Sequence, residues 1–455
     1  MIVCKFGGTS VGDAAAIRRT AGIVKSRLDR NPIVVVSALG GATNVLLALA
    51  EQAARGHLIG ALRAVQNLRE RHLREAEALL GANTADGVDI ADELGGMFDE
   101  LASLAEALSV LGHITPRSLD AVAAFGEQLS SLMCAAAFRA EGVEAEHVDA
   151  RKVMITDDQF TRAEPQTEAI ADAVREHLLP IVKRGAVPLL GGYIGSTIKG
   201  GITTTLGRGG SDYSASLIGA ALKAEAIEIW TDVDGMLTAD PRVVKKAKTI
   251  EAVGFEEASE LASFGAKVLH PYTIAPAVRI GIPVYVLNSH NPAGKGTVIT
   301  HDAPRRPVTA IAGKSKVTLV KVRSPRMLLS EGFLRELFAI FEKHKTSVDV
   351  VATSEVSVSL TIDDAGRLEE LMGELRQLGD VAIESDRGIV AVVGAAMSES
   401  SDTMSRALRC LGGIRLHMLS LSATGINLTM VMDADEVNPL MQRLHAEFFE
   451  QGEGA

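Results

Sequence analysis

The run Pro32–Ser37, with the sequence PIVVVS, constrains the fold of this chain most. A strand with apolar side chains on both faces must be covered on both faces, which is typical of a parallel sheet between helices. Ile2–Phe6 is a similar run, and a glycine pair and a helix predicted over Asp13–Leu28 separate the two. This β-α-β order requires a right-handed crossover. The sequence therefore predicts an α/β fold with a parallel-rich central sheet and helices on both faces.

A long helical segment interrupts this pattern at about residues 44–140. Apolar residues recur there at helical spacing, with Glu and Arg between them. Pro116 suits the first turn of the last helix, and Thr115 suits its N-cap. We therefore predict a helical insertion in the α/β core. Its helices are predicted over Val45–Arg55, Leu58–Leu80, Ile90–Leu111 and Leu119–Ala140.

Strands and helices alternate again after residue 140. Strands are predicted over Val143–Asp149, Ala186–Leu190, Ala226–Thr231 and Pro283–Leu287. Helices are predicted over Glu168–Val182, Ser211–Leu222, Glu257–Phe264 and His270–Val278. A polar, proline-rich stretch at residues 301–307 then indicates a boundary. We assign residues 1–300 to one domain and residues 301–314 to a linker.

Two units of similar design follow this linker. The first is predicted to contain Val317–Val322, Gly332–His344, Ser347–Thr353, Val356–Ile362, Arg367–Leu378 and Val381–Glu384. The second is predicted to contain Ile389–Gly394, Thr403–Leu411, Ile414–Leu419, Ile426–Met432 and Asn438–Phe448. Both follow a β-α-β-β-α order, which is a ferredoxin-like plan present twice. We assign the units to residues 315–388 and 389–455.

Composition excludes several functional classes. The net charge of −11 argues against nucleic-acid binding, which needs a clustered basic face. No apolar run approaches the roughly 20 residues of a membrane span, and the N-terminus lacks a signal-peptide pattern. Cys4, Cys134 and Cys410 have no metal-like spacing, so we interpret them as reduced thiols. We expect a cytoplasmic protein.

The stretch Lys5–Gly12 (KFGGTSVG) is the first candidate anion site. Gly7 and Gly8 would let backbone N–H groups approach phosphate oxygens, and Lys5 would add a full positive charge. We expect Thr9 or Ser10 near the cap of the following helix. A tight turn with a surface lysine explains this stretch equally well.

A second glycine-rich stretch, Thr203–Asp212 (TTTLGRGGSD), places Arg208 among three glycines directly before a helix. We expect Ser211 or Asp212 to cap that helix. Arg208 could bind a carboxylate or a phosphate through two parallel hydrogen bonds. A purely structural loop rarely combines these features, so we favour a binding function.

Trp230–Gly235 (WTDVDG) follows a strong strand and should lie at its carboxyl end, where open α/β sheets bind ligands. Asp232 and Asp234 could orient Mg²⁺ or a ribose, although an Asp-Gly turn explains Asp234 by itself. Arg242 and Lys267 could each meet a phosphate.

Glu127 lies in an otherwise apolar helix, within the sequence FGEQLSS at residues 125–131. A lone acid there usually faces water. It could instead meet the ammonium group of a substrate.

Taken together, these stretches resemble the aspartokinases, a branch of the amino acid kinase fold. KFGGTS at residues 5–10, GExxS at 126–130, TTLGRGGSD at 204–212, WTDVxG at 230–235, DPR at 240–242 and FGAKVLHP at 264–271 occur in the order of that family. The two C-terminal units resemble the tandem ACT domains of the same enzymes.

The resemblance implies transfer of the γ-phosphoryl group of ATP to the side-chain carboxylate of L-aspartate, the first step toward lysine, threonine and methionine. The implied catalytic residues are Lys5, Asp212 and Lys267. The implied aspartate contacts are Ser37, Thr43, Glu127 and Arg208. The implied nucleotide contacts are Lys5, Gly7, Gly8, Ser10, Thr231, Asp232, Leu237, Arg242, Lys267 and Val268. Leu237 stands where many relatives carry an aromatic residue, which leaves that contact open.

This chemistry needs no general base, because the attacking carboxylate is already an anion. It needs charge neutralisation and in-line positioning of two anions. Lys5, Lys267 and Mg²⁺ would supply the charge. We expect no dedicated protein site for Mg²⁺, which the nucleotide phosphates would mainly hold.

The first ACT unit resembles the effector site of lysine-sensitive aspartokinases. The implied effector residues are Met327, Ser330, Gly332, Phe333, Leu334, Ser347, Val348, Asp349, Thr353, Ser354 and Glu355. Backbone N–H groups at residues 330–334 would receive a carboxylate, and Asp349 and Glu355 would receive ammonium groups. A plain turn with exposed acids is the alternative. ACT pairing between subunits implies a homodimer or a tetramer.

Two rival functions remain at this point. A kinase for glutamate, acetylglutamate or a nucleoside monophosphate would generally lack the ACT pair. A catalytically silent sensor would have lost Lys5, Arg208 or Asp212, and all three are present. The length leaves no room for an appended dehydrogenase, so we expect a monofunctional enzyme.

Overall fold

The computed structural model describes residues 1–82, 84–264, 271–328, 331–363, 366 and 368–450. The chain divides into two compact units. The first comprises Met1–Gly235 and Leu269–His301, and the second comprises Met236–Val268 and Asp302–Ala455.

The first unit is built on a sheet whose strands follow the order β3-β5-β2-β1-β8-β10-β11. All neighbouring pairs are parallel except β10 with β11, which confirms the predicted parallel-rich sheet. The strands are β1 (Ile2–Phe6), β2 (Pro32–Val36), β3 (Ala145–His147), β5 (Val187–Gly191), β8 (Ala226–Thr231), β10 (Val284–Asn288) and β11 (Thr297–Ile299).

Helices cover both faces of this sheet, as the apolar strands require. α1 (Ala14–Lys25) and α6 (Phe125–Ala140) pack on the face of β1 that carries Ile2, Cys4 and Phe6. α9 (Gly210–Leu222) covers the other face, where Gly219 lies against Ile227. β1, β2 and β5 are buried at every position.

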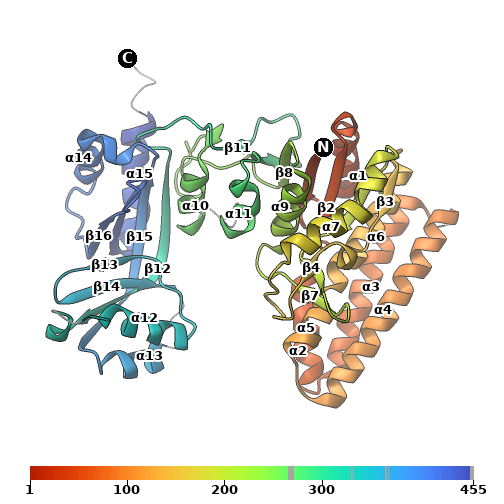
Figure 1. The fold of residues 1–455 in the computed structure, drawn as a ribbon, viewed down its shortest axis with the longest axis horizontal. Coiled ribbons are helices and arrows are strands. Elements are labelled where there is room, and N and C mark those ends of the chain that lie inside the picture. Colours follow the sequence, from red (N-terminus) through yellow and green to blue (C-terminus); the bar gives the residue numbers. More distant parts are fainter. Residues whose placement is uncertain (83, 265–270, 329–330, 364–365, 367, 451–455) are drawn as a thin grey trace. The chain divides into compact units, whose positions relative to one another are not determined.

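The helical insertion is confirmed. It contains α2 (Ala42–Ala54), α3 (Leu58–Leu80), α4 (Ala85–Leu111) and α5 (Pro116–Ala123) before α6. Thr115 caps α5 as predicted, and its hydroxyl accepts a hydrogen bond from the N–H of Ser118. Figure 1 shows α3 and α4 side by side.

The first unit also contains elements that differ from the prediction. A small sheet of β4 (Ile155–Thr156), β6 (Ile194–Thr197) and β7 (Thr203–Thr205) was not expected. The helix predicted over 168–182 is two helices, α7 (Thr167–His177) and α8 (Leu179–Lys183), because Pro180 starts a new first turn. α11 spans Pro271–Arg279.

Both glycine loops enter their helices differently from the prediction. α1 begins at Ala14, and Asp13, not Thr9 or Ser10, accepts the capping hydrogen bond from the N–H of Ala16. The cap of α9 is Gly209, so Ser211 and Asp212 lie inside its first turn. α1 therefore begins one residue later than predicted, and α9 begins one residue earlier.

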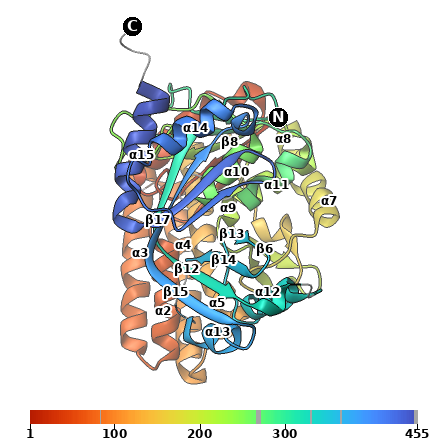
Figure 2. The same ribbon diagram turned by 90° about the vertical axis from the view of Figure 1, so that its left-hand side faces the viewer.

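The second unit has one antiparallel sheet with the order β13-β14-β12-β15-β17-β16. Its strands are β12 (Ala310–Arg323), β13 (Val351–Thr353), β14 (Ser357–Ile362), β15 (Asp380–Val393), β16 (Met418–Leu421) and β17 (Asn427–Asp433), and β9 spans Ala252–Val253. Its helices are α10 (Phe255–Ser263), α12 (Phe333–Lys343), α13 (Leu368–Leu375), α14 (Ser401–Arg409) and α15 (Val437–His445). α12 and α13 lie at one end of the sheet, and α14 and α15 lie at the other (Figures 1 and 2).

Short helical turns complete the two units. They are Leu28–Arg30, Ala150–Lys152, Pro325–Met327, Met397–Glu399, Ala434–Glu436 and Ala446–Glu450.

The two ferredoxin-like halves are present, but they do not follow one another along the chain as predicted. Ala310–Ser315 pairs with Gly388–Val393 in one half, and Val317–Arg323 pairs with Asp380–Arg387 in the other. β12 thus includes part of the predicted linker, and β15 crosses the predicted boundary at 388/389. Register shifts between Ser315 and Leu319 let one strand serve both halves.

The predicted domain boundary near residue 300 also differs from the division into two units, because residues 236–268 belong to the second unit. Residues 236–264 are bonded within the second unit: the N–H of Ile311 donates to the carbonyl of Thr238, and Thr309 donates to Glu257. These bonds join segments far apart in the sequence, so local patterns could not reveal them.

The expectation that no apolar segment is long enough to span a membrane was wrong. The stretch Pro116–Ala140, which forms α5 and α6, contains an 18-residue window apolar enough to cross a membrane. Of that window, 89% is buried inside the protein, which is the behaviour of a core helix in a folded domain.

Candidate active site

The carboxyl ends of four parallel strands lie at one edge of the first unit's sheet. The register aligns Phe6 of β1 with Val36 of β2 and Trp230 of β8, and Val36 with Gly191 of β5. The loops after these strands therefore begin side by side, which is where open α/β sheets bind ligands. A cavity of about 440 Å³ lies there. It is lined by Lys5, Gly8, Ser37, Ala38, Leu39, Gly40, Gly41, Thr43, Asn44, Glu127, Tyr193, Gly207, Arg208, Gly209, Gly210, Ser211 and Asp212.

Lys5 and Asp212 form an ion pair in this cavity, with 2.6 Å between Nζ and Oδ1. Both side chains are nearly buried, with 11% and 14% of their surfaces exposed. A strand and a helix separated by about 200 positions thus meet at one point. The carboxylate fixes the ammonium group in the cavity, where it can neutralise a bound anion.

Two loops meet beside this pair through glycine backbones. A Cβ atom on Gly8 would lie 2.9 Å from the carbonyl oxygen of Ala38, and one on Gly40 would lie 3.3 Å from the carbonyl oxygen of Gly8. A side chain at Gly8 would therefore push the two loops apart. The close approach explains why the first loop needs glycine here.

Glu127 is buried in the cavity wall on α6. Its Oε1 accepts a hydrogen bond of 3.2 Å from the N–H of Ala38, and among the described residues its Oε2 has no partner. Burial raises the pKa of Glu127 to about 8, although Lys5 and the Ala38 N–H act in the opposite direction. A buried, unpaired carboxylate oxygen is costly unless a ligand completes it.

Arg208, Thr43 and Ser37, the other predicted aspartate contacts, also line the cavity. Arg208 is exposed, and within the described part of the chain no hydrogen bond or ion pair of its side chain is seen. Its guanidinium group is therefore available to a carboxylate in the cavity. The carbonyl of Ser37 is held by the hydroxyl of Ser130, which donates at 2.8 Å.

Tyr193 and Asn44 line the cavity too, and sequence reasoning missed both. Tyr193 has a φ of 65°, an unusual backbone conformation for a non-glycine residue that often marks functional sites. Its ring lies against Gly210, where a Cβ atom would approach it to 2.7 Å. The glycine pair Gly191-Gly192 directly before it was the available signal.

The nucleotide candidates are only partly described. The N–H of Gly7 donates to the carbonyl of Trp230, and the hydroxyl of Ser10 is buried and donates to Ser289 at 2.8 Å. Thr231 ends β8 and donates to the exposed Asp232. Ser10 therefore contributes to holding the loop. Leu237 and Arg242 belong to the second unit, and Lys267, Val268 and His270 lie outside the described residues.

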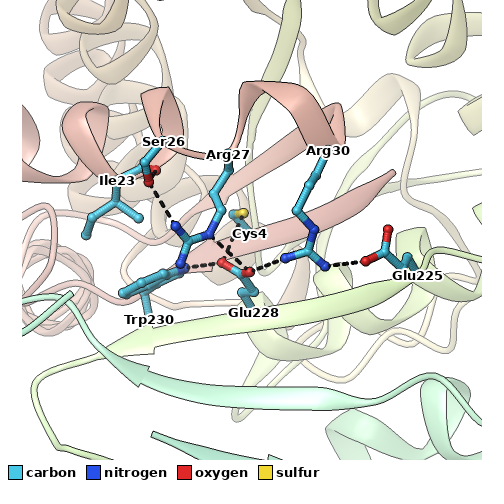
Figure 3. A network of polar contacts seen from close by, with 8 residues as sticks. All are labelled: Cys4, Ile23, Ser26, Arg27, Arg30, Glu225, Glu228 and Trp230. Carbon is cyan, nitrogen blue, oxygen red and sulfur yellow. Dashed lines mark hydrogen bonds and ion pairs between the residues drawn. The ribbon is translucent and has the colours of Figure 1, made fainter. Parts of the chain in front are cut away.

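A buried polar network lies behind the site, between β1, β8 and the end of α1 (Figure 3). Glu228 accepts hydrogen bonds from Arg27 at 3.3 Å, from Arg30 at 3.0 Å and from the indole N–H of Trp230 at 3.1 Å. The Cys4 thiol faces the same carboxylate, and burial followed by the charge of Glu228 raises the pKa of Cys4. This network fixes the two strands that deliver Lys5 and Trp230.

The predicted effector residues lie around α12 and β13 in the second unit. Gly332, with a φ of 93°, precedes α12, and Phe333, the first residue of that helix, is buried. Asp349 is paired with Lys314, which also contacts Asp363. Met327 lies before α12, and Leu334 lies in its first turn. The other described residues of this set lie in or beside β13, namely Ser347, Val348, Thr353, Ser354 and Glu355. Ser330 lies outside the described residues.

Comparison with known proteins agrees with this arrangement. Residues 1–288 match the model of the amino acid kinase family. The lysine-sensitive aspartokinase 3 of Escherichia coli is 40% identical to this chain, over 99% of both chains. The crystal structure of E. coli aspartokinase III with aspartate and ADP, in its R-state, superposes with a TM-score of 0.85 at 39% identity, covering 99% of this chain and 100% of that one. The T-state structure of the same enzyme with lysine and aspartate gives 0.83 at 38% identity, covering 99% of each chain. This chain therefore belongs to the amino acid kinase family and, within it, to the aspartokinases.

Proposed function

We propose that this chain transfers the γ-phosphoryl group of ATP to the β-carboxylate of L-aspartate and forms 4-phospho-L-aspartate and ADP. The main support is a single cavity with three charged or ionisable groups in its wall. They are the Lys5–Asp212 pair, the guanidinium of Arg208, and Oε2 of Glu127, which has no partner among the described residues. An α-amino acid offers matching groups, and the relative crystallised with aspartate and ADP supports the choice of aspartate.

The substrate would be held at its amino-acid end. Its ammonium group would meet Oε2 of Glu127, and its α-carboxylate would meet Arg208. The β-carboxylate would then be directed toward Lys5. Thr43 and Ser37 would supply neutral polar contacts from the facing loop.

The nucleotide would approach from the glycine loop after β1. Lys5 and the backbone N–H group of Gly8 would neutralise phosphate oxygens, because the N–H of Gly7 already donates to the carbonyl of Trp230. Lys267 and Arg242 are further candidates. Thr231 and Asp232 would lie near the ribose or base. Among the described residues no cluster of three or more His, Cys, Asp or Glu side chains could hold a metal ion. Mg²⁺ would take most of its ligands from phosphate oxygens, and it would neutralise charge on them.

The second unit would bind lysine as an inhibitor. Support comes from the lysine sensitivity of the E. coli relative and from its T-state complex with lysine. The turn before α12 would receive the carboxylate, and Asp349 and Glu355 would receive the ammonium groups. We further propose a cytoplasmic homodimer or tetramer joined through ACT sheets, because β13 and β16 are edge strands.

Two measurements test the catalytic proposal. ADP release is coupled to NADH oxidation with aspartate, glutamate or acetylglutamate as acceptor, and only aspartate should give full turnover. Lys5→Met should then lower kcat on the order of 10²- to 10³-fold, as loss of an electrostatic donor does. The double variant Lys5→Met/Asp212→Asn restores charge balance and should fold normally yet stay inactive. Near-normal turnover of either variant would contradict the role of Lys5.

A further inference from the structure

The C-terminal half of helix α3 contacts both glycine loops of the active site. Arg71 donates from Nη1 to the carbonyl oxygen of Gly40 at 2.8 Å, and from Nη2 to the carbonyl oxygen of Gly12 at 3.0 Å. Gly40 belongs to the loop after β2, which lines the cavity. Gly12 ends the loop after β1, which begins with Gly7 and Gly8. One guanidinium group thus bridges the two loops.

The same helix also holds the start of α1. One turn beyond Arg71, Oε2 of Glu75 accepts a hydrogen bond of 2.9 Å from the N–H of Ala14, the first residue of α1. Arg18 of α1 donates to the carbonyl of Ala78 near the end of α3. Arg71 and Glu75 therefore bind the chain on both sides of Asp13, the cap of α1. A negative charge at a helix N-terminus adds favourable electrostatics.

The loops need such support because they meet through backbone alone. Gly8 and Gly40 have no side chains, and a Cβ atom added to them would lie 2.9 Å from the carbonyl oxygen of Ala38 and 3.3 Å from that of Gly8, respectively. The carbonyl oxygens of Gly40 and Gly12 lie at partly buried positions, where the guanidinium group of Arg71 satisfies both. The planar fork of arginine can satisfy two acceptors at fixed spacing, whereas the single ammonium of lysine cannot span them in the same way.

We infer that Arg71 is a positioning residue for phosphoryl transfer: it sets the distance between the phosphate-binding loop after β1 and the aspartate-binding loop after β2. The inference rests on the proposed roles of those loops. Arg71 is not among the residues that line the cavity. It acts by keeping the two anionic reactants at a fixed separation, and a misplacement of about 1 Å can lower a rate roughly 10²-fold.

The test compares Arg71→Ala and Arg71→Lys with Arg69→Ala. Arg69 lies on the same helix, and its guanidinium pairs with Asp99 of α4 at 2.7 Å, away from both loops. For each variant we would measure kcat, the KM values for ATP and aspartate, and the thermal unfolding midpoint. Arg71→Ala should lose on the order of 10- to 100-fold in kcat, with a higher KM for both substrates. The kcat of Arg71→Lys should lie between those of Arg71→Ala and the wild type, because lysine keeps one donor group.

A role in folding alone predicts a different pattern. The unfolding midpoint of Arg71→Ala would then fall, while kcat per folded molecule and both KM values would equal those of Arg69→Ala. That result, or constants within twofold of Arg69→Ala for both Arg71 variants, would overturn the inference. The wild type serves as the separate check: if it failed to phosphorylate aspartate in the same assay, the proposed function would fail, and not the role of Arg71.

Discussion

At the scale of single residues, burial governs the ionisation of Glu127 more strongly than the nearby positive charge of Lys5 does. The carboxyl group lies almost wholly out of water, and its pKa rises to about 8 for that reason. A carboxylic acid with this pKa is largely neutral at pH 7 in the free enzyme. A substrate ammonium group needs the ionised form as its partner, so binding of aspartate and loss of this proton should be coupled.

We therefore expect kcat/KM for aspartate to rise with pH up to about 8, because kcat/KM reports ionisations of the free enzyme. Initial rates at saturating ATP between pH 6 and 9.5 would check this. Glu127→Gln should abolish the rise and raise the KM for aspartate. A pH-independent kcat/KM in the wild type would contradict the assignment.

The raised pKa of Glu127 also predicts how the free energy of unfolding depends on pH. Its pKa is raised in the folded state, so the folded protein holds the proton to higher pH than the unfolded chain does. The contribution of the protonated Glu127 to the free energy of unfolding is complete below pH 4.5 and is lost as pH rises to about 8. Denaturant unfolding of the ligand-free wild type should show this loss relative to Glu127→Gln.

At the scale of elements, the network around Glu228 joins β8 to the end of α1. Glu228 has only 4% of its side chain exposed, whereas Glu225, which pairs with Arg30 at 2.6 Å, has 63% exposed. Arg27 additionally stacks over the ring of Trp230 at 5.5 Å, and that ring stacks on Phe6. Strand, helix and aromatic pair thus depend on one buried carboxylate (Figure 3).

Glu228→Gln should lower the free energy of unfolding by about 2 kcal/mol, because it removes the buried charge partner of the partly exposed Arg27 and Arg30. Glu225→Gln is the matched control and should change it by less than about 1 kcal/mol, since the exposed pair is screened by water. Urea unfolding followed by circular dichroism would compare them. Equal effects of the two substitutions would show that burial of Glu228 carries no special weight.

At the scale of the whole molecule, the proposed inhibition requires that lysine bound to the second unit change the activity of the first. Linkage requires that lysine bind one conformation of the enzyme better than another. Asp349 is a suitable contact because it already holds a cation, the ammonium group of Lys314. Burial raises its pKa to about 6, with Asp363 adding to the shift and Lys314 opposing it.

Asp349→Asn should raise the lysine concentration for half-inhibition by roughly tenfold or more, the cost of a lost charged contact, and leave the uninhibited kcat unchanged. Inhibition of the wild type should also weaken below pH 6, as Asp349 is protonated. Asp402→Asn, an exposed position on α14, is the control and should keep normal inhibition. Unaltered inhibition of Asp349→Asn would place the effector elsewhere.

The sequence by itself determined the parts of this protein that depend on local patterns. Apolar runs such as Pro32–Val36 specify buried strands, helical spacing specifies the insertion, and Lys5 and Arg208 could be identified from their glycine-rich settings. Such patterns act over a few residues, so they can be read without a fold. The order of strands at the sheet edge then brings Lys5 and Asp212 together.

Only the tertiary structure decided the rest, because it depends on contacts between distant segments. The sharing of β12 and β15 by both halves follows from a register shift between strands about 70 positions apart. The raised pKa of Glu127 comes from burial that several elements create jointly, and the bridge made by Arg71 joins two loops to a helix that is distant in sequence. No short-range pattern encodes these relations, since the same residues in another packing would be ordinary solvated side chains.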